Sequence, residues 1–122
     1  AESVEYLQKQ SAQLPSKMRY ISAQFLAMLK DDLWLDHARH ANEMAQLLAD
    51  GITDIPQVTI SQPIEANAVF ATLPKETIPE LQAWSPFYKW EGDDEVRWMT
   101  SFATKVSDVE ALVEGVRAAV GK

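Results

Sequence analysis

Residues 95–104 read EVRWMTSFAT, and in this stretch Val96, Trp98 and Phe102 alternate with other residues, with Thr100 in the same series. This alternation is typical of a strand, because successive side chains of a strand point to opposite faces. The even-numbered residues from Val96 to Phe102 would share one face, and Arg97 would lie on the other beside small or apolar neighbours. A guanidinium there needs an anionic partner or water. Two interpretations stay open: a surface arginine on the solvent side of an antiparallel sheet, or a clamp for a carboxylate.

The chain before this stretch predicts further short strands and a helix. Residues 87–92 (FYKWEG) and the strand from residue 95 flank an acidic turn, GDD, so an antiparallel hairpin is expected. Two earlier runs have β-branched and aromatic content between prolines, which favours strands that begin or end where a backbone N–H is dispensable. These runs are 57–61 (QVTIS) and 66–73 (ANAVFATL). A short helix with Pro79 near its first turn is expected over 75–84.

The first half of the chain predicts two long amphipathic helices. Over 16–30, apolar residues recur three and four positions apart, and Ser16 is the expected N-cap. Over 32–51, Asp32 is the expected cap. Gly51 would end this second helix in the left-handed conformation that glycine adopts freely.

The order of these elements predicts an α+β fold. A last helix is expected over 107–121, with Ser107 and Glu110 as a capping box, and a short one over 2–14. Two long helices followed by the order β, β, α, β, β, α describe a small antiparallel sheet covered by helices on one face. A chain of 122 residues fits a single domain, 1–122.

The composition excludes several functional classes. A net charge of −7 with scattered basic residues repels phosphate backbones, so no nucleic acid is expected as a partner. No uncharged apolar stretch reaches the roughly 18 residues typical of a membrane span, so no membrane association is expected. The first residues do not read as a signal peptide. The absence of cysteine removes thiol chemistry, and a cytoplasmic location is the default expectation.

Two histidines are the obvious candidates for metal ligands. His37 and His40 would share one helical face near Asp36 and Glu43. Zinc sites on helices need further ligands from elsewhere, and this chain has two histidines and no cysteine, so no metal site is expected. His37 is interpreted as a residue at the edge of the core and His40 as solvated. Phosphate-loop, zincin and hydrolase motifs are missing as well.

Two polar residues stand in unusual places. Asn67 lies in an apolar strand, where its amide must be satisfied by ordering a neighbouring loop or by facing a pocket. Arg19 lies in the first turn of a predicted helix, against the preference of the helix dipole. It is therefore either solvated or held there by an external anion.

Taken together, four segments resemble, in order, the C-terminal portion of low-specificity threonine aldolases in the β-eliminating lyase group. The segments are 16–29 (SKMRYISAQFLAML), 36–51 (DHARHANEMAQLLADG), 63–74 (PIEANAVFATLP) and 95–113 (EVRWMTSFATKVSDVEALV). The resemblance implies the small C-terminal domain of a fold-type I enzyme, which has the aspartate-aminotransferase fold and uses pyridoxal phosphate. It also implies a homo-oligomer, dimeric or tetrameric, that acts on a small β-hydroxy amino acid.

The resemblance also implies roles for single residues. The family has a Met-Arg pair at the start of the first long helix, a TNxVF-type strand, and a VRxxT strand whose arginine grips the substrate carboxylate. The matching positions are Met18 and Arg19, Asn67 to Phe70, and Val96, Arg97 and Thr100. By this resemblance Arg97 binds the substrate. Arg19 lies near the cofactor phosphate, its own or that of a neighbouring subunit, and Lys9 assists it.

The chain departs from the family in ways that limit these expectations. Family members have glycines where this chain has 15–17 (PSK), and a histidine where it has Ser101, so the amino acid cleaved stays open. The choice between retro-aldol cleavage and β-elimination stays open as well. The Schiff-base lysine of the family lies in the large domain, upstream of these segments. None of the seven lysines here has that context, so no catalytic residue is assigned.

Because no lysine here has the context of the family's Schiff-base lysine, the chain is expected to be a fragment that is inactive alone. The expected content is the small domain with part of the linking helix, and the large cofactor domain is missing. The alternative is a free-standing, non-catalytic acidic α+β domain that binds a protein or a small carboxylate.

Overall fold

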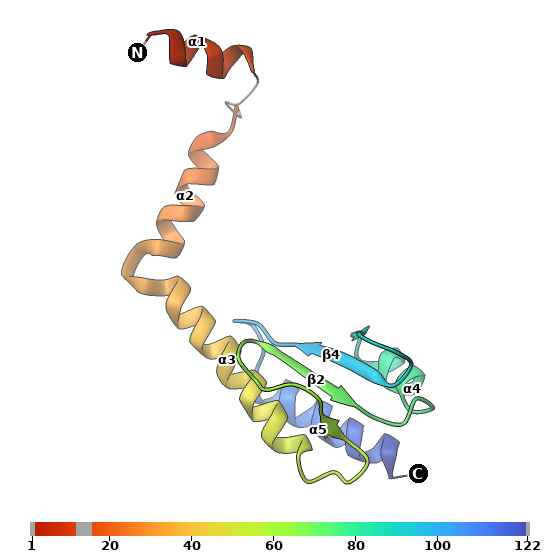
Figure 1. The fold of residues 1–122 in the computed structure, drawn as a ribbon. Coiled ribbons are helices and arrows are strands. Elements are labelled where there is room, and N and C mark those ends of the chain that lie inside the picture. Colours follow the sequence, from red (N-terminus) through yellow and green to blue (C-terminus); the bar gives the residue numbers. More distant parts are fainter. Residues whose placement is uncertain (1, 12–15, 122) are drawn as a thin grey trace. The chain divides into compact units, whose positions relative to one another are not determined.

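The computed structural model describes residues 2–11 and 16–121, and Figure 1 shows their helices and strands. The chain divides into two compact units, 1–34 and 35–122, and each is described by itself. The first unit holds α1 (Glu2–Gln10), α2 (Met18–Leu29), η1 (Lys30–Asp32) and the start of α3 (Leu33–Ile52). The helix expected over 2–14 is thus present up to residue 10, and residues 12–14 lie outside the described part.

Helix α2 is confirmed, but its N-cap lies one residue later than expected. Lys17 occupies the N-cap position and makes no side-chain cap, so Ser16 does not cap the helix. The helix ends at Leu29 because the chain turns sharply in η1, where Asp31 and Asp32 have φ angles of 55° and 58°. Aspartate tolerates this left-handed region better than most residues. The turn separates α2 from α3, and Asp32 directly precedes α3.

The second unit contains a four-stranded antiparallel sheet. Its strands lie in the order β1-β2-β4-β3 and all pair antiparallel, which confirms the predicted hairpin. The long central strands are β2 (Ala68–Thr72) and β4 (Glu95–Met99), and the short edge strands are β1 (Thr59–Ile60) and β3 (Tyr88–Lys89). Strand β4 ends at Met99, earlier than the alternation to Phe102 suggested, so Phe102 is exposed rather than buried with Val96.

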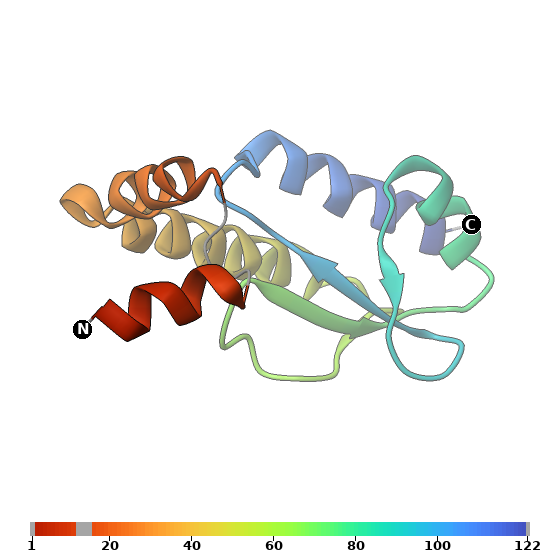
Figure 2. The same cartoon turned by 90° about the horizontal axis from the view of Figure 1, so that it is seen from above.

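The core lies between one face of this sheet and the helices. Helices α3, α4 (Ile78–Trp84) and α5 (Val106–Val120) supply apolar side chains that pack against it, and Figure 2 shows α3 and α5 along the same side of β2 and β4. From the sheet, the fully or nearly fully buried residues include Val69 and Ala71 of β2 and Val96 and Trp98 of β4. Burial of alternate residues confirms the predicted α+β fold with helices on one face.

Gly51 does not end its helix, contrary to expectation. Helix α3 continues to Ile52, and Gly51 lies inside it. A Cβ at this position would meet Cγ2 of Val113 at 2.7 Å, which is too close for a carbon pair. Gly51 is therefore needed for the close approach of α3 to α5 and not for a left-handed turn.

The start of α5 also differs from the predicted capping box. The helix begins at Val106, so Ser107 lies in its first turn. The carboxylate of Asp108 accepts a hydrogen bond of 2.9 Å from the backbone N–H of Lys105. The carboxylate thus satisfies a backbone donor at the helix start, which Glu110 was expected to do.

No described helix is long and apolar enough to cross a membrane.

Candidate functional site

Arg97 lies in the middle of β4, on the face of the sheet that the helices leave open. It stands opposite Phe70 of β2 and Tyr88 of β3 in the strand register. Its Cζ lies 4.6 Å from the centre of the Trp90 ring and 5.8 Å from that of the Tyr88 ring. Trp90 in turn contacts Phe70 edge to face, with ring centres 5.2 Å apart. We call Phe70, Tyr88 and Trp90 the aromatic cluster.

The aromatic cluster was not predicted from the sequence, although a signal for it was present. The hairpin pairs 87–92 with the strand that carries Arg97, and Tyr88 and Trp90 stand two residues apart, so these two side chains share one face of the sheet. The register of the hairpin was the missing information, because a shift of one residue exchanges the two faces.

The guanidinium of Arg97 has no carboxylate partner in the described part of the chain. Its Nε is buried and makes no hydrogen bond there. Glu95 lies on the same face of β4, but its carboxylate accepts a hydrogen bond from the hydroxyl of Ser61 instead. A charged group with unused donors needs an anion or water, so the open sheet face carries a site suited to an anionic group.

The four arginines of the chain fall into two classes. Arg39 and Arg117 form exposed ion pairs, with Asp36 at 3.6 Å and with Asp54 at 3.1 Å. Arg19 and Arg97 pair with no carboxylate among the side chains that the structure describes, which do not include those of Glu2 and Glu5. These are the two arginines that the resemblance assigned to anionic groups.

Arg19 lies in the first turn of α2 and is exposed. One terminal nitrogen donates to the hydroxyl of Tyr20 at 3.0 Å, and the guanidinium carbon lies 4.9 Å from the centre of that ring. The first turn of α2 contains no acidic residue. Free N–H groups at a helix start and a nearby arginine both favour an anion such as a phosphate. Lys9 is exposed in the last turn of α1.

Asn67 orders the end of β4, which is one of the two roles that were left open for it. Its side-chain amide donates to the carbonyl of Thr100 at 2.7 Å. The hydroxyl of Thr100 donates to the carbonyl of Ala41 in α3, also at 2.7 Å. These bonds attach the end of the strand that carries Arg97 to β2 and to α3.

The two histidines contact other residues of the second unit and not each other or a cluster of acidic side chains in the described structure. His37 stacks on Phe102 with ring centres 4.8 Å apart. The Nε2 atom of His40 lies 2.7 Å from the carbonyl of Thr104, so His40 is partly buried and hydrogen-bonded rather than solvated as expected. The loop after β4 covers this part of α3, which the sequence could not show. Within the described ranges, no three side chains of His, Cys, Asp or Glu gather into a possible metal site.

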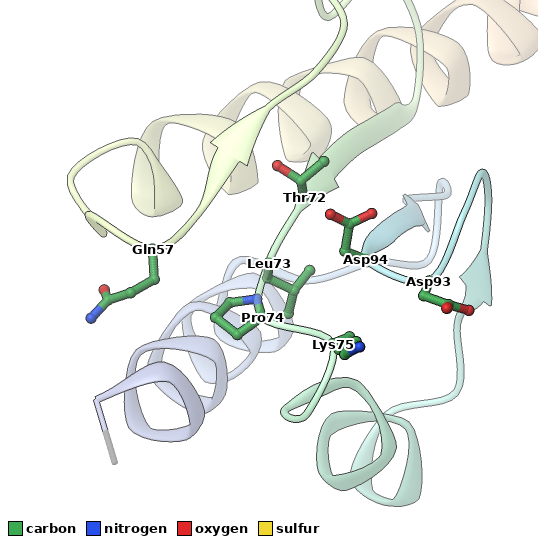
Figure 3. Close-up of a pocket in the computed structure, with 7 residues that line it drawn as sticks. All are labelled: Gln57, Thr72, Leu73, Pro74, Lys75, Asp93 and Asp94. Atoms are coloured by element: carbon green, nitrogen blue, oxygen red, sulfur yellow. The ribbon is translucent and has the colours of Figure 1, made fainter.

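An open depression of about 640 Å³, which Arg97 does not line, is shown in Figure 3. Three segments border it: the loop before β1, the end of β2 with the following loop, and the acidic turn before β4. Its lining residues are Gln57, Thr72, Leu73, Pro74, Lys75, Asp93 and Asp94. None of them was assigned to substrate or cofactor by the sequence analysis.

Comparison of the sequence with known proteins finds close relatives along the whole chain. No family model matches. The low-specificity L-threonine aldolase of Pseudomonas aeruginosa is 41% identical over 123 residues, which is 99% of this chain and 35% of that protein. The enzyme of the same name from a Pseudomonas species is 41% identical over 120 residues, with 97% and 34% covered. The chain therefore spans about a third of the length of these relatives.

Solved structures show the same fold. The threonine aldolase of Leishmania major superposes with a TM-score of 0.70 at 29% identity, over 80% of this chain and 29% of that one. A glycine decarboxylase (P-protein) has a TM-score of 0.66 at 22% identity, with 80% and 24% covered. An aminotransferase from Streptoalloteichus hindustanus has a TM-score of 0.55 at 14% identity, over 70% of this chain and 32% of that one. The last two support the fold alone. The resemblance inferred from the four sequence segments is confirmed.

Proposed function

We propose, on the premise that this chain is a homologue of low-specificity threonine aldolases, that it is the C-terminal part of a pyridoxal-phosphate-dependent lyase acting on a β-hydroxy amino acid. Support comes from the 41% identity over nearly the whole chain, together with the coverage of only 35% of the relative. The domain assigned to 1–122 is the small domain with part of the linking helix. The rest of the longer protein supplies the large cofactor domain.

In this proposal Arg97 binds the carboxylate of the amino-acid substrate. The observation that carries the proposal is that Arg97 stands in the VRxxT strand with no carboxylate partner among the described residues, yet with aromatic rings holding its guanidinium. A planar guanidinium makes two parallel bonds to a carboxylate. Charge-assisted bonds of this kind contribute about 1.5–3 kcal/mol each.

Arg19 is proposed to bind the cofactor phosphate, of its own or of a neighbouring subunit, with Lys9 contributing charge. The fit is chemical: Arg19 is exposed at a helix start, without an acidic residue in that turn. When bound, pyridoxal phosphate supplies the electron sink for the charge that develops on the substrate. The contribution of this chain is binding and orientation, because Arg97 fixes the carboxylate and thereby the direction of the bond to be broken.

The 122-residue chain alone is proposed to be inactive. A lysine that forms a Schiff base lies in a desolvated pocket that lowers its pKa. The described lysines, Lys9, Lys17, Lys30, Lys75, Lys89 and Lys105, are all exposed. Lys122 lies outside the described residues. The catalytic lysine is therefore expected in the large domain.

The central test is the substitution Arg97→Lys in the full-length protein. Lysine keeps the charge but loses the planar fork, so kcat/KM for the amino acid is expected to fall by about tenfold to a thousandfold. Arg97→Ala should lower it further. Cofactor absorbance and thermal stability should stay near the wild-type values, because Arg97 holds no other charged group in the described structure.

Arg117→Lys is the matched control. This arginine forms an exposed pair with Asp54, so its substitution should leave the kinetics unchanged. Wild-type kinetics in Arg97→Lys, or loss of the fold in both Arg97 variants, would make Arg97 a structural residue and the proposal wrong.

The wider assignments follow from the same proposal. We place the parent enzyme in the cytoplasm as a homo-oligomer, dimeric or tetrameric, with a small amino-acid substrate. The alternative of a free-standing, non-catalytic domain stays a prediction. Reading the coding sequence upstream of Ala1 separates the two, because the proposed enzyme requires a lysine-bearing cofactor domain there.

A further inference from the structure

We infer that Trp90 is a positioning residue for Arg97: the guanidinium carbon lies over the face of the indole ring, and this contact keeps the terminal N–H groups directed at the substrate carboxylate. The inference rests on the proposed function of Arg97. No role was predicted for Trp90 from the sequence, and the resemblance to the aldolase family did not include it.

Trp90 and a bound carboxylate would contact different parts of the Arg97 guanidinium. The Cζ of Arg97 lies 4.6 Å from the centre of the Trp90 ring, a distance at which the ring face attracts a cation. The Tyr88 ring, at 5.8 Å, is the weaker neighbour. A carboxylate binds the N–H groups along the edge of the guanidinium and not its face, so the ring and the substrate do not compete.

Burial of one guanidinium nitrogen limits which N–H groups of Arg97 a carboxylate can reach. Nε is the guanidinium nitrogen that is buried without a hydrogen bond, so the terminal nitrogens remain as accessible donors. These two nitrogens point the same way and match the two oxygens of a carboxylate. The side chain is thus held for an end-on pair of bonds.

Trp90 is itself fixed, as a positioning residue has to be. Its backbone N–H donates to the carbonyl of Glu95 at 2.9 Å, which anchors it across the hairpin from β4. Its ring meets that of Phe70 at an interplanar angle of 65°. An arginine without such contacts samples many rotamers, and substrate binding has to restrict them. Contact with a fixed ring reduces that cost before the substrate arrives.

The test compares three variants of the full-length holoenzyme. Trp90→Phe keeps an aromatic face, whereas Trp90→Leu and Trp90→Met keep apolar bulk without one. Trp90 is 46% exposed, so these changes remove little of the core. We expect kcat/KM for L-threonine to fall by about threefold to thirtyfold in the Leu and Met variants, and by less in the Phe variant.

Two readouts distinguish positioning from a general structural effect. The inhibition constant of 1-amino-2-propanol, which is L-threonine without its carboxylate, should not change in any Trp90 variant. In the Arg97→Lys background, Trp90→Leu should have a much smaller effect than in the wild type, because Trp90 acts through the guanidinium. Trp84→Leu is the matched control: Trp84 is 56% exposed and no ring contact joins it to Arg97 in the described structure.

The outcomes separate this inference from the proposed function. If Arg97→Lys lowers kcat/KM and Trp90→Leu and Trp90→Met do not, the inference is overturned and the role of Arg97 stands. The inference is overturned too if the amine loses affinity as much as the amino acid. If Arg97→Lys itself has wild-type kinetics, the proposed function fails first. Should the Leu variant not fold, the Met variant decides.

Discussion

Thr100 connects three parts of the molecule through one hydroxyl. It is 5% exposed, donates to the carbonyl of Ala41 and lies 3.2 Å from the carbonyl of Asn67. The side-chain amide of Asn67 donates a hydrogen bond to the carbonyl of Thr100. This network joins the end of β4 to β2 and to α3, close to the strand position of Arg97. Each intramolecular hydrogen bond of this kind contributes about 0.5–1.5 kcal/mol, so the network is expected to contribute to stability.

Thr100→Val is therefore expected to lower the free energy of unfolding by about 0.5–1.5 kcal/mol, because it removes the hydroxyl bonds to the carbonyls of Ala41 and Asn67. Urea unfolding of the 122-residue chain, followed by circular dichroism, measures the change. Thr72→Val is the matched control, since the Thr72 hydroxyl makes an exposed bond of 3.5 Å and should contribute less than about 0.5 kcal/mol. Equal effects of the two substitutions would contradict the role of this network.

At the scale of the elements, the contact between α3 and α5 depends on Gly51. The position lies inside a helix, where glycine is about 1 kcal/mol less favourable than alanine. The close approach of Val113 explains why alanine cannot replace it without movement. Helix propensity and packing therefore oppose each other at this position.

Packing is expected to prevail at Gly51. Gly51→Ala should destabilise the chain by about 1–3 kcal/mol, as overpacked cores do, despite the better helix propensity of alanine. Adding Val113→Ala should recover part of the loss, which a thermal unfolding series measures as a coupling between the two sites. Gly115→Ala is the control, because its nearest neighbour, at 3.1 Å, is the ring of the exposed Trp84, which is free to shift. A stabilised Gly51→Ala would show that the helices separate easily.

For the molecule as a whole, α2 presents an apolar surface without a core of its own. No residue of this helix is buried, and Phe25, Leu26 and Leu29 are 65%, 71% and 62% exposed. An open apolar hollow of about 440 Å³ lies on this unit, lined by Gln24, Phe25, Met28, Leu29 and Trp34. Surfaces of this kind are typical of contacts with another domain or subunit.

The isolated 122-residue chain is accordingly expected to self-associate. Sedimentation velocity should show a mass that rises with concentration, and a dye that binds apolar surface should fluoresce with the chain. The double variant Phe25→Gln and Leu29→Gln should reduce both signals, whereas Lys89→Gln on the other unit should not. A monomer at high concentration without dye binding would contradict this prediction.

The sequence by itself determined the kinds of elements, their order and the buried faces of the central strands. Periods of two and of three to four reflect local backbone geometry, so they are readable without knowledge of distant contacts. The alternation from Val96 to Trp98 and the helix over α5 are confirmed for this reason. The four segments, in their order along the chain, were sufficient to indicate the resemblance to low-specificity threonine aldolases.

Only the tertiary structure decided how distant residues meet. Gly51 is required because Val113 of α5 lies too close for a side chain at that position. His40 is hydrogen-bonded because the loop after β4 brings the carbonyl of Thr104 to it. The Trp90 ring contacts Arg97 because the register of the hairpin places the two residues on one face. Each of these depends on a contact between segments far apart in the chain or on the register of a strand pair. Local patterns do not encode such contacts, because a glycine, a histidine or a tryptophan has the same local preferences wherever its partner lies.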